Sequence, residues 1–290
     1  MSTDLSSTPA AAGGTIRIGD DLTVNRLGFG AMRLTGPGFW GDPADPDEAV
    51  RVVRRAVELG VNFIDTADAY GPFTSDRIIK KALHPYADDL VIATKVGLTR
   101  PGPDDWRPVG RPEYLRQQTE LNLRHLGLET IPLLQLHRID PAVPLEDQVG
   151  ELAELRNEGK IRHIGLSEVT VEETEKARAV APIVSVQNLY NVAARTSEDV
   201  LRHTERHGMV FIPWFPLAMG QLAAPGSPLE AVLRDSGATP AQLALAWLLR
   251  HSPALLPIPG TSSVGHLEEN VGGASIRLSD DDYRTITAAC

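Results

Sequence analysis

Four polar residues, each at or just after the end of an apolar segment, have side chains that together suit acid catalysis on a carbonyl group. Asp65 ends NFID and Tyr70 follows in the next loop, while Lys95 ends LVIATK and His137 ends IPLLQLH. A free tyrosine has a pKa of about 10, so it donates a proton poorly at pH 7 unless its phenolate is stabilised. A neighbouring ammonium group supplies that stabilisation. The four residue types therefore predict proton donation to a carbonyl oxygen by Tyr70.

We expect the other three side chains to support this proton transfer. Lys95 is expected to lower the pKa of the phenol, Asp65 to hold and neutralise the ammonium in an ion pair, and His137 to orient the substrate carbonyl. Singly, each residue has an ordinary structural explanation as a loop cap, a surface lysine, a turn tyrosine or a satisfied histidine. The occurrence of all four at successive strand ends favours the catalytic interpretation.

The elements that must position these residues alternate along the whole chain as short strands and helices. Apolar runs rich in Val, Ile and Leu are followed by helical patterns, which is typical of βα units with parallel strands. The candidate strands are Leu27–Gly30, Asn62–Asp65, Leu90–Lys95, Ile131–His137, Ile161–Ser167, Ile183–Gln187, Met209–Pro213 and Leu255–Pro259. They predict a (β/α)8 TIM barrel, preceded by an N-terminal β-hairpin over residues 15–18 and 22–24. Active sites of such barrels lie at the C-terminal strand ends, so the four polar residues are expected on one rim.

Length and composition favour a single domain of ordinary make-up. The 290 residues are 42% hydrophobic and 23% charged, and we assign residues 15–290 to one barrel domain after a flexible N-terminal tail, residues 1–14. The formal net charge of −10 argues against a nucleic-acid partner. No apolar run reaches the roughly 18 residues of a membrane helix, and the one cysteine, Cys290, excludes an internal disulfide. We therefore expect a cytoplasmic protein with neither a nucleic-acid nor a membrane partner.

Several motifs resemble those of the aldo-keto reductase superfamily. GVNFIDTADAYG is similar to its Asp and Tyr motif, VIATK to its lysine strand and LLQLHRID to its histidine strand, and the likeness extends from residue 15 to about residue 283. The resemblance implies a nicotinamide cofactor bound in extended form across the barrel mouth, without a Rossmann domain. It also implies reduction of a small aldehyde or ketone.

The resemblance assigns a set of cofactor-binding positions to this chain. IGLSE places Ser167 and Glu168, where the family usually has Asn at the second position, and VQNLYN places Gln187 against the nicotinamide carboxamide. In IPWFPLAMG, Trp214 resembles the residue that stacks on the nicotinamide ring, and Phe215 replaces the usual Ser. The full set is Gly30, Met32, Ser167, Glu168, Gln187, Trp214, Phe215, Pro216, Leu217, Gly260, Thr261, Ser262, Ser263, His266, Glu269 and Asn270.

The segment IPGTSSVGHLEEN bears on the choice between NADP and NAD. Its hydroxyl residues precede or open a helix, where backbone N–H groups favour an anion such as a cofactor phosphate. Many family members have a Lys and an Arg for the adenosine 2′-phosphate where this chain has Gly260 and His266. We expect NADPH to be preferred, with NADH as a possible alternative.

A closer similarity concerns the substrate. ATPAQLALAWLLRHSP followed by IPGTSSVGHLEEN, together with WFPL and DTADAYGP, is similar to bacterial pyridoxal reductases within the superfamily. Reduction of pyridoxal to pyridoxine is therefore the substrate hypothesis. Trp40, Phe73 and Trp106, with the aromatic residues at 214 and 215, are the candidate flat walls for such an aldehyde.

The sequence also admits three other interpretations. Gly36, Gly38 and Gly41 spell GxGxxG, but prolines interrupt the motif and the next helix is expected only after Asp45, which argues against a dinucleotide-binding turn. A metal-dependent barrel hydrolase lacks a close pair of ligands, and Lys95 would repel a cation, so no metal is expected. A cofactor-binding redox sensor with slow turnover remains open, and steady-state NADPH consumption separates it from an enzyme.

Overall fold

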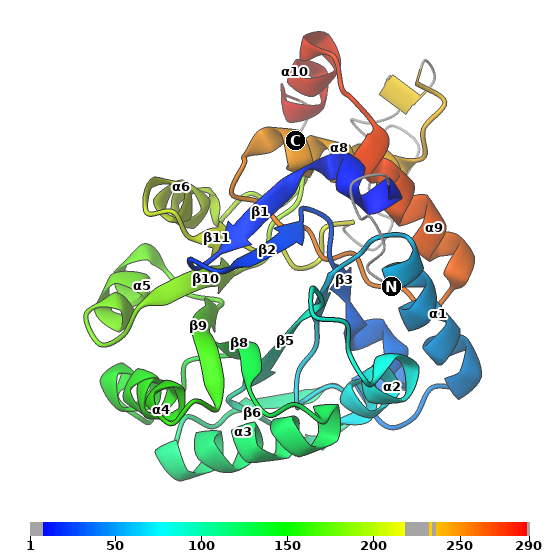
Figure 1. The fold of residues 1–290 in the computed structure, drawn as a ribbon. Helices are drawn as coiled ribbons and strands as arrows, with labels where there is room; N and C mark the ends of the chain where they lie inside the picture. The colour runs from blue at the N-terminus through cyan, green and yellow to red at the C-terminus, as the bar shows by residue number, and fades with distance from the viewer. Residues whose placement is uncertain (1–7, 218–231, 234–235, 289–290) are drawn as a thin grey trace.

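A curled sheet of parallel strands forms the centre of the computed structural model, which describes residues 8–217, 232–233 and 236–288. The strand order is β11-β10-β9-β8-β5-β4-β3, and every neighbouring pair is parallel. Their bounds are β3 (Phe29–Gly30), β4 (Phe63–Asp65), β5 (Val91–Val96), β8 (Ile131–Leu136), β9 (Ile161–Ser167), β10 (Ile183–Gln187) and β11 (Val210–Phe211). Figure 1 shows the strands around a common centre, with the helices outside them.

Residues 254–259 take the place of the predicted eighth strand. The Leu256 N–H donates to Phe211 O at 2.9 Å, and the Gly28 N–H donates to Pro257 O at 2.9 Å, so this segment joins both edges of the sheet. Pro257 and Pro259 have no N–H to donate, which is why the segment pairs irregularly and is not a regular strand. Seven regular strands and this closing segment fit a (β/α)8 barrel.

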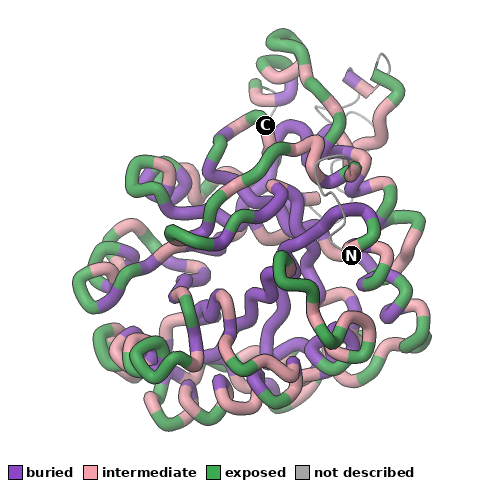
Figure 2. Tube along the Cα trace, viewed as in Figure 1, coloured by how far each residue is buried: buried purple, intermediate pink, exposed green. Residues whose placement is uncertain are grey.

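Amphipathic helices cover the outside of the sheet. They are α1 (Pro46–Glu58), α2 (Thr74–Leu83), α3 (Pro112–Leu126), α4 (Leu145–Asn157), α5 (Val171–Arg178), α6 (Glu198–Arg206), α8 (Pro240–His251), α9 (Val264–Gly272) and α10 (Asp280–Ala288). In α1 the inward side chains Val52, Val53 and Ala56 are buried, whereas Arg51 and Arg54 are exposed. Figure 2 shows the same division, with buried chain along the strands and exposed chain on the outer helix faces. No helix in the described ranges is long and apolar enough to cross a membrane.

The predicted N-terminal hairpin closes one end of the barrel. β1 (Thr15–Ile18) pairs with β2 (Leu22–Asn25) in antiparallel register. Its side chains Ile18, Leu22 and Val24 belong to an interior cluster with Phe63 and Val91, which begin β4 and β5. The hairpin therefore packs against the N-terminal strand ends and leaves the opposite, C-terminal ends for a site.

Two segments differ from the expectations. Residues 9–13 of the expected flexible tail form a 3-10 helix, and Ala10 is fully buried with its N–H bonded to Leu59 O at 3.0 Å. That part of the tail prediction was wrong, because the small alanine side chains fit closely against the core; residues 1–7 lie outside the described chain. The second segment is a hairpin between β5 and α3, formed by β6 (Leu98–Gly102) and β7 (Asp105–Pro108), which was not predicted.

Candidate active site

A cavity of about 1000 Å³ lies at the C-terminal ends of the strands. Gly30, Asp65, Ser167 and Gln187 are the last residues of β3, β4, β9 and β10, and all four line it. Because parallel strands end at the same rim, residues far apart in sequence converge here. The volume is at the upper end of the range for small-molecule sites, which suits an extended ligand together with a second, smaller one.

Lys95 links two other predicted catalytic residues, Asp65 and Tyr70, at the base of this cavity. Its Nζ donates to Asp65 Oδ2 at 2.5 Å, to the Tyr70 hydroxyl at 3.1 Å and to the backbone carbonyl of Thr66 at 3.0 Å. The lysine is fully buried, and the aspartate and tyrosine are nearly so. Since β4 and β5 are neighbours, their C-terminal ends bring the carboxylate and the ammonium together.

The other oxygen of Asp65 is held by two amides that the sequence places far away. Gln135 Nε2 from β8 and Gln187 Nε2 from β10 each donate to Asp65 Oδ1 at 2.9 Å. The carboxylate is thus engaged by one ammonium and two amide groups. Gln135 was not predicted, although it is a polar residue inside the apolar strand IPLLQLH, and that pattern is the signal that identifies it.

Burial and charge act in opposite directions on the phenol. Burial raises the pKa of Tyr70, while Lys95 and, more weakly, Arg138 lower it, and the net direction is upward. Lys95 therefore acts on the Tyr70 pKa in the predicted direction, while desolvation by burial has the larger effect. Burial acts to lower the pKa of Lys95, but Asp65 and Tyr70 raise it by more, so the net pKa lies above its ordinary value. The ammonium is therefore charged at neutral pH. The site holds a protonated phenol beside a permanent cation.

His137 follows β8 and lines the same cavity as a neutral imidazole. Burial, with the positive charges of Lys95, Arg138 and Arg100, holds the pKa of His137 well below its usual value. Its ring lies edge-on to Tyr70, with 5.9 Å between centroids. Nδ1 is buried and has no hydrogen-bond partner within the described part of the chain. A neutral ring can donate one hydrogen bond without adding charge to the site.

One of the three predicted substrate walls lies in the cavity. Trp106 lines it from β7 and meets Tyr70 edge-on at 6.3 Å between centroids, and Phe39 joins it from the loop before α1. Trp40 and Phe73 lie outside the lining, which corrects those two predictions. Phe73 stacks on His125 at 4.4 Å between centroids, and Trp40 lies under Arg100.

Arg100 on β6 fixes this wall and was not predicted. Its guanidinium lies 3.5 Å from the centroid of the Trp106 ring. It also donates to five backbone carbonyls, those of Gly38, Phe39, Ala69, Gly102 and Asp105. In sequence, a basic residue within LTRPGPDDW has the pattern of an exposed loop, so only the fold shows that it organises the substrate side of the cavity.

Most predicted cofactor positions line the cavity, with two exceptions. The lining includes Gly30, Met32, Ser167, Gln187, Trp214, Phe215, Pro216, Leu217, Gly260, Thr261, Ser262, His266, Glu269 and Asn270. Glu168 instead lies behind it, where Oε1 accepts from Trp214 Nε1 at 2.6 Å and from the Leu189 N–H at 2.7 Å. Glu168 therefore holds the indole of Trp214 in place. Ser263, the second exception, occupies the N-cap position of α9.

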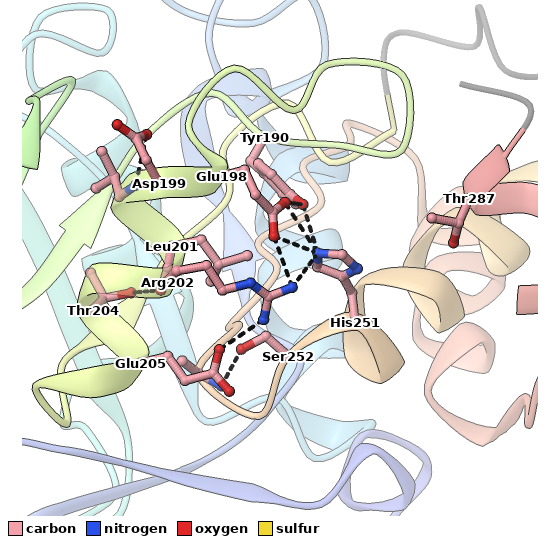
Figure 3. Close-up of polar contacts among 12 residues, drawn as sticks. Tyr190, Glu198, Asp199, Leu201, Arg202, Thr204, Glu205, His251, Ser252 and Thr287 are labelled. Atoms are coloured by element: carbon pink, nitrogen blue, oxygen red, sulfur yellow. Dashed lines mark hydrogen bonds and ion pairs between the residues drawn. The ribbon is translucent and has the colours of Figure 1, made fainter. Parts of the chain in front are cut away.

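A second polar cluster supports the segment that follows β10 (Figure 3). Tyr190 is fully buried, and its hydroxyl bonds with Glu198 and, at 2.9 Å, with His251. Arg202 pairs with Glu198 at 2.8 Å. Because the Tyr190 N–H also donates to Trp214 O at 3.5 Å, the cluster connects α6 and α8 to the backbone of the cavity wall.

Gly260 is required by a close approach of two backbones. A Cβ at this position would lie 2.6 Å from Gly30 O, closer than real Cβ atoms come. A lysine at position 260 would therefore force β3 away from the segment that closes the barrel.

The GxGxxG turn does not present a helix N-terminus to a ligand. Asp45 caps α1 by accepting from the N–H groups of Asp47 and Glu48, as its sequence position indicates. The Gly36 N–H donates to Gly41 O at 3.1 Å, which closes the loop on itself. The first turn of α1 is thus occupied by the protein's own carboxylate.

Comparisons with known proteins identify the family of this chain. Residues 26–290 match the model of the Aldo/keto reductase family. An uncharacterised oxidoreductase of Schizosaccharomyces pombe is 51% identical over 278 residues, covering 96% of this chain and 90% of the relative. Pyridoxine 4-dehydrogenase of Escherichia coli is 44% identical over 270 residues, covering 91% of this chain and 94% of the relative.

Solved structures give the same result. The glycerol dehydrogenase from Gluconobacter oxydans has a TM-score of 0.86 at 28% identity, covering 96% of this chain and 95% of that one. An aldo-keto reductase from Klebsiella pneumoniae in complex with NADPH has a TM-score of 0.81 at 26% identity, covering 94% of each chain. On the family match, the relatives and the fold, this chain belongs to the aldo/keto reductase family and is an oxidoreductase.

Proposed function

We propose that the protein reduces a small aromatic aldehyde with NADPH, that pyridoxal is its substrate, and that Tyr70 donates the proton. The observation that carries the proposal is the 3.1 Å contact between Lys95 Nζ and the Tyr70 hydroxyl at the base of the cavity. A buried phenol beside a fixed ammonium has one clear chemical use, which is to release a proton to an oxygen that becomes negative.

The residues present fit a nicotinamide cofactor. Glu168 holds the indole of Trp214 against the cavity, which offers a fixed flat surface for a planar ring. At the other end, Thr261 and Ser262 lead into α9, where hydroxyls and the helix start suit a phosphate. The Klebsiella pneumoniae structure contains NADPH, and that supports the same cofactor here. When bound, the nicotinamide supplies the hydride for the carbonyl carbon.

The chain's own residues manage the proton and the orientation of the substrate. Tyr70 gives its phenolic proton to the carbonyl oxygen, and the resulting phenolate is stabilised by the Lys95 ammonium. Asp65 keeps that ammonium in place and neutralises its charge before the proton leaves. His137, neutral at physiological pH, donates a hydrogen bond to the carbonyl oxygen and so fixes its direction.

Support for an aromatic aldehyde comes from the wall beside Tyr70 and from one relative. Trp106 and Phe39 provide apolar surface next to the phenol, where a flat ring packs better than a polar sugar chain. The E. coli relative that is 44% identical is a pyridoxine 4-dehydrogenase. We propose the direction aldehyde to alcohol, pyridoxal to pyridoxine, because a buried, protonated phenol beside Lys95 can donate a proton to the carbonyl oxygen.

Steady-state kinetics test the proposal. With NADPH, we expect kcat/KM to be highest for pyridoxal, lower for benzaldehyde and lowest for a sugar aldehyde. For each aldehyde, we expect kcat/KM to be lower with NADH than with NADPH. Equal use of NADH contradicts the cofactor assignment, and pyridoxal below the sugar contradicts the substrate assignment. Tight NADPH binding without turnover of any aldehyde contradicts the enzymatic function and favours a redox sensor.

A further inference from the structure

Arg138 is a cation in the cavity wall that forms no ion pair with a carboxylate of the described residues. It follows His137 at the end of β8 and lines the cavity. Its Nη1 donates to the His137 carbonyl at 2.7 Å and to Ser167 Oγ at 3.1 Å, and these are its polar contacts within the described residues. Nε and Nη2 are thus left with N–H groups to donate. Both existing acceptors are neutral, so the guanidinium charge is not compensated by an ion pair.

The nearest acidic group is already engaged. Glu168 attracts Arg138 through space, but its Oε1 accepts from Trp214 Nε1 and the Leu189 N–H instead. Burial lowers the pKa of Arg138, and the more distant charges of Glu168 and Tyr70 offset this only in part. Uncompensated partly buried arginines of this kind suit an anion that arrives with a ligand.

The position of Arg138 separates it from the phosphate-binding end of the cavity. β8 is separated from β3 by β5 and β4 in the sheet, whereas α9 packs against α1 and α8 on the β3 side (Figure 1). Arg138 instead adjoins His137, and its positive charge acts to lower the pKa of Tyr70, though less than Lys95 does. A ligand anion held by Arg138 therefore lies beside the reacting carbonyl.

We propose that Arg138, anchored by Ser167, binds an anionic oxygen that the substrate carries next to its aldehyde group. The substrate class is an aromatic aldehyde with an ionised ring hydroxyl ortho to the carbonyl. Pyridoxal has this arrangement, because its protonated ring nitrogen makes the neighbouring hydroxyl acidic. The inference rests on the proposed reductase function and adds a recognition element to it. Arg138 touches the substrate but takes no part in proton transfer.

A matched pair of aldehydes isolates this contact. The aldehydes 3-hydroxypyridine-4-carbaldehyde and pyridine-4-carbaldehyde differ only in the ortho hydroxyl. With Arg138→Gln we expect kcat/KM to fall by about 10- to 100-fold for the hydroxylated aldehyde, the loss expected for a charge-assisted hydrogen bond. For pyridine-4-carbaldehyde we expect a change of less than about threefold, because only the common ring and carbonyl remain. Arg138→Lys keeps the positive charge but loses the planar guanidinium. Its kcat/KM for the hydroxylated aldehyde should lie between those of the wild type and Arg138→Gln.

The control variant is Arg162→Gln, at the start of β9, where the guanidinium is exposed and pairs with Asp21. We expect it to leave both aldehydes unchanged. Equal losses for the two aldehydes in Arg138→Gln overturn the proposal, because the residue then only supports His137. A raised Kd for NADPH with no discrimination between aldehydes also overturns it, since the guanidinium then binds the cofactor.

Binding measurements keep the inference testable if the wild-type protein reduces neither aldehyde. Quenching of tryptophan fluorescence in the presence of NADP gives the Kd of each aldehyde without turnover. Weaker binding of the hydroxylated aldehyde alone in Arg138→Gln supports the anion contact even where the reductase proposal fails. Unchanged Kd values for both aldehydes contradict it.

Discussion

Replacing Lys95 by Met is expected to lower both the unfolding free energy and the turnover, and a second substitution can then restore the first without the second. Met has nearly the length of the lysine stem and fills the same space, so the variant removes the charge with little loss of packing. Asp65, which is 1% exposed, is then left buried without its cation. Breaking a buried ion pair in this way costs about 3–5 kcal/mol of unfolding free energy. We expect the lower figure, because the amides of Gln135 and Gln187 still donate to the carboxylate.

The double variant Asp65→Asn with Lys95→Met should recover most of that stability. Asn Oδ1 can still accept the two amide hydrogen bonds, and no charge remains buried. We expect the double variant to be about 2 kcal/mol more stable than Lys95→Met alone. Its turnover should stay as low as that of the single variant, because the phenolate of Tyr70 has no ammonium in either protein.

Urea unfolding followed by circular dichroism measures these differences, and NADPH oxidation measures turnover. Lys160→Met is the matched control, because this lysine pairs with Glu158 at 2.7 Å in contact with solvent, and its loss should change the unfolding free energy far less. A Lys95→Met protein as stable as the wild type refutes the reasoning. So does a double variant that regains activity together with stability.

Two further expectations follow from groups outside the predicted catalytic set, and a third concerns the cofactor. Arg100→Met should lower kcat/KM for aromatic aldehydes about tenfold, because the Trp106 wall loses its support. The Kd of NADPH should stay unchanged. Equal effects on kcat/KM and on this Kd would argue against a role confined to the substrate side. Burial raises the pKa of Asp76 from 3.8 to about 7, so the folded state holds this proton more tightly than the unfolded chain. The associated stability is complete below about pH 4 and is lost as pH rises to about 7, by up to about 4 kcal/mol. Asp76→Asn should therefore melt progressively higher than the wild type between pH 5 and pH 8, and parallel Tm curves would contradict this. Glu48 Oε1 accepts from the Val264 N–H at the start of α9. Glu48→Gln should therefore lower the KM for NADPH about two- to fivefold, because it removes a negative charge near the proposed phosphate position. An unchanged ratio of kcat/KM for NADPH to kcat/KM for NADH would place the phosphate elsewhere.

The sequence predicted the arrangement of the site better than its detailed contacts. Asp65, Lys95 and His137 follow apolar runs, and parallel strands bring such ends to one rim, so their convergence needed only the alternation of strands and helices. Asp45 also marked the start of α1, because capping depends on local spacing. Local patterns that set backbone conformation were sufficient for these features.

Features that depend on contacts distant in sequence were not predictable in this way. The β6–β7 hairpin is built from a segment rich in Pro, Gly and Asp with no alternating pattern, and it is held by Arg100 through carbonyls from other segments. The sequence also does not predict the direction in which an aromatic side chain of a loop points. Phe73 stacks on His125 at 4.4 Å between ring centroids and is not part of the cavity lining. The eighth strand is irregular because its prolines lack an N–H donor, and whether that donor is needed depends on which backbone groups lie opposite.

The most direct test of the account is single-turnover oxidation of bound NADPH by Tyr70→Phe with an unactivated aldehyde. The account predicts a rate lower by about 100- to 10,000-fold, the usual contribution of a general acid, with the Kd of NADPH nearly unchanged. The control Tyr86→Phe, which removes a hydroxyl that donates to Leu126 O away from the cavity, should keep the wild-type rate. A Tyr70→Phe protein that oxidises NADPH at close to the wild-type rate would show that another group donates the proton.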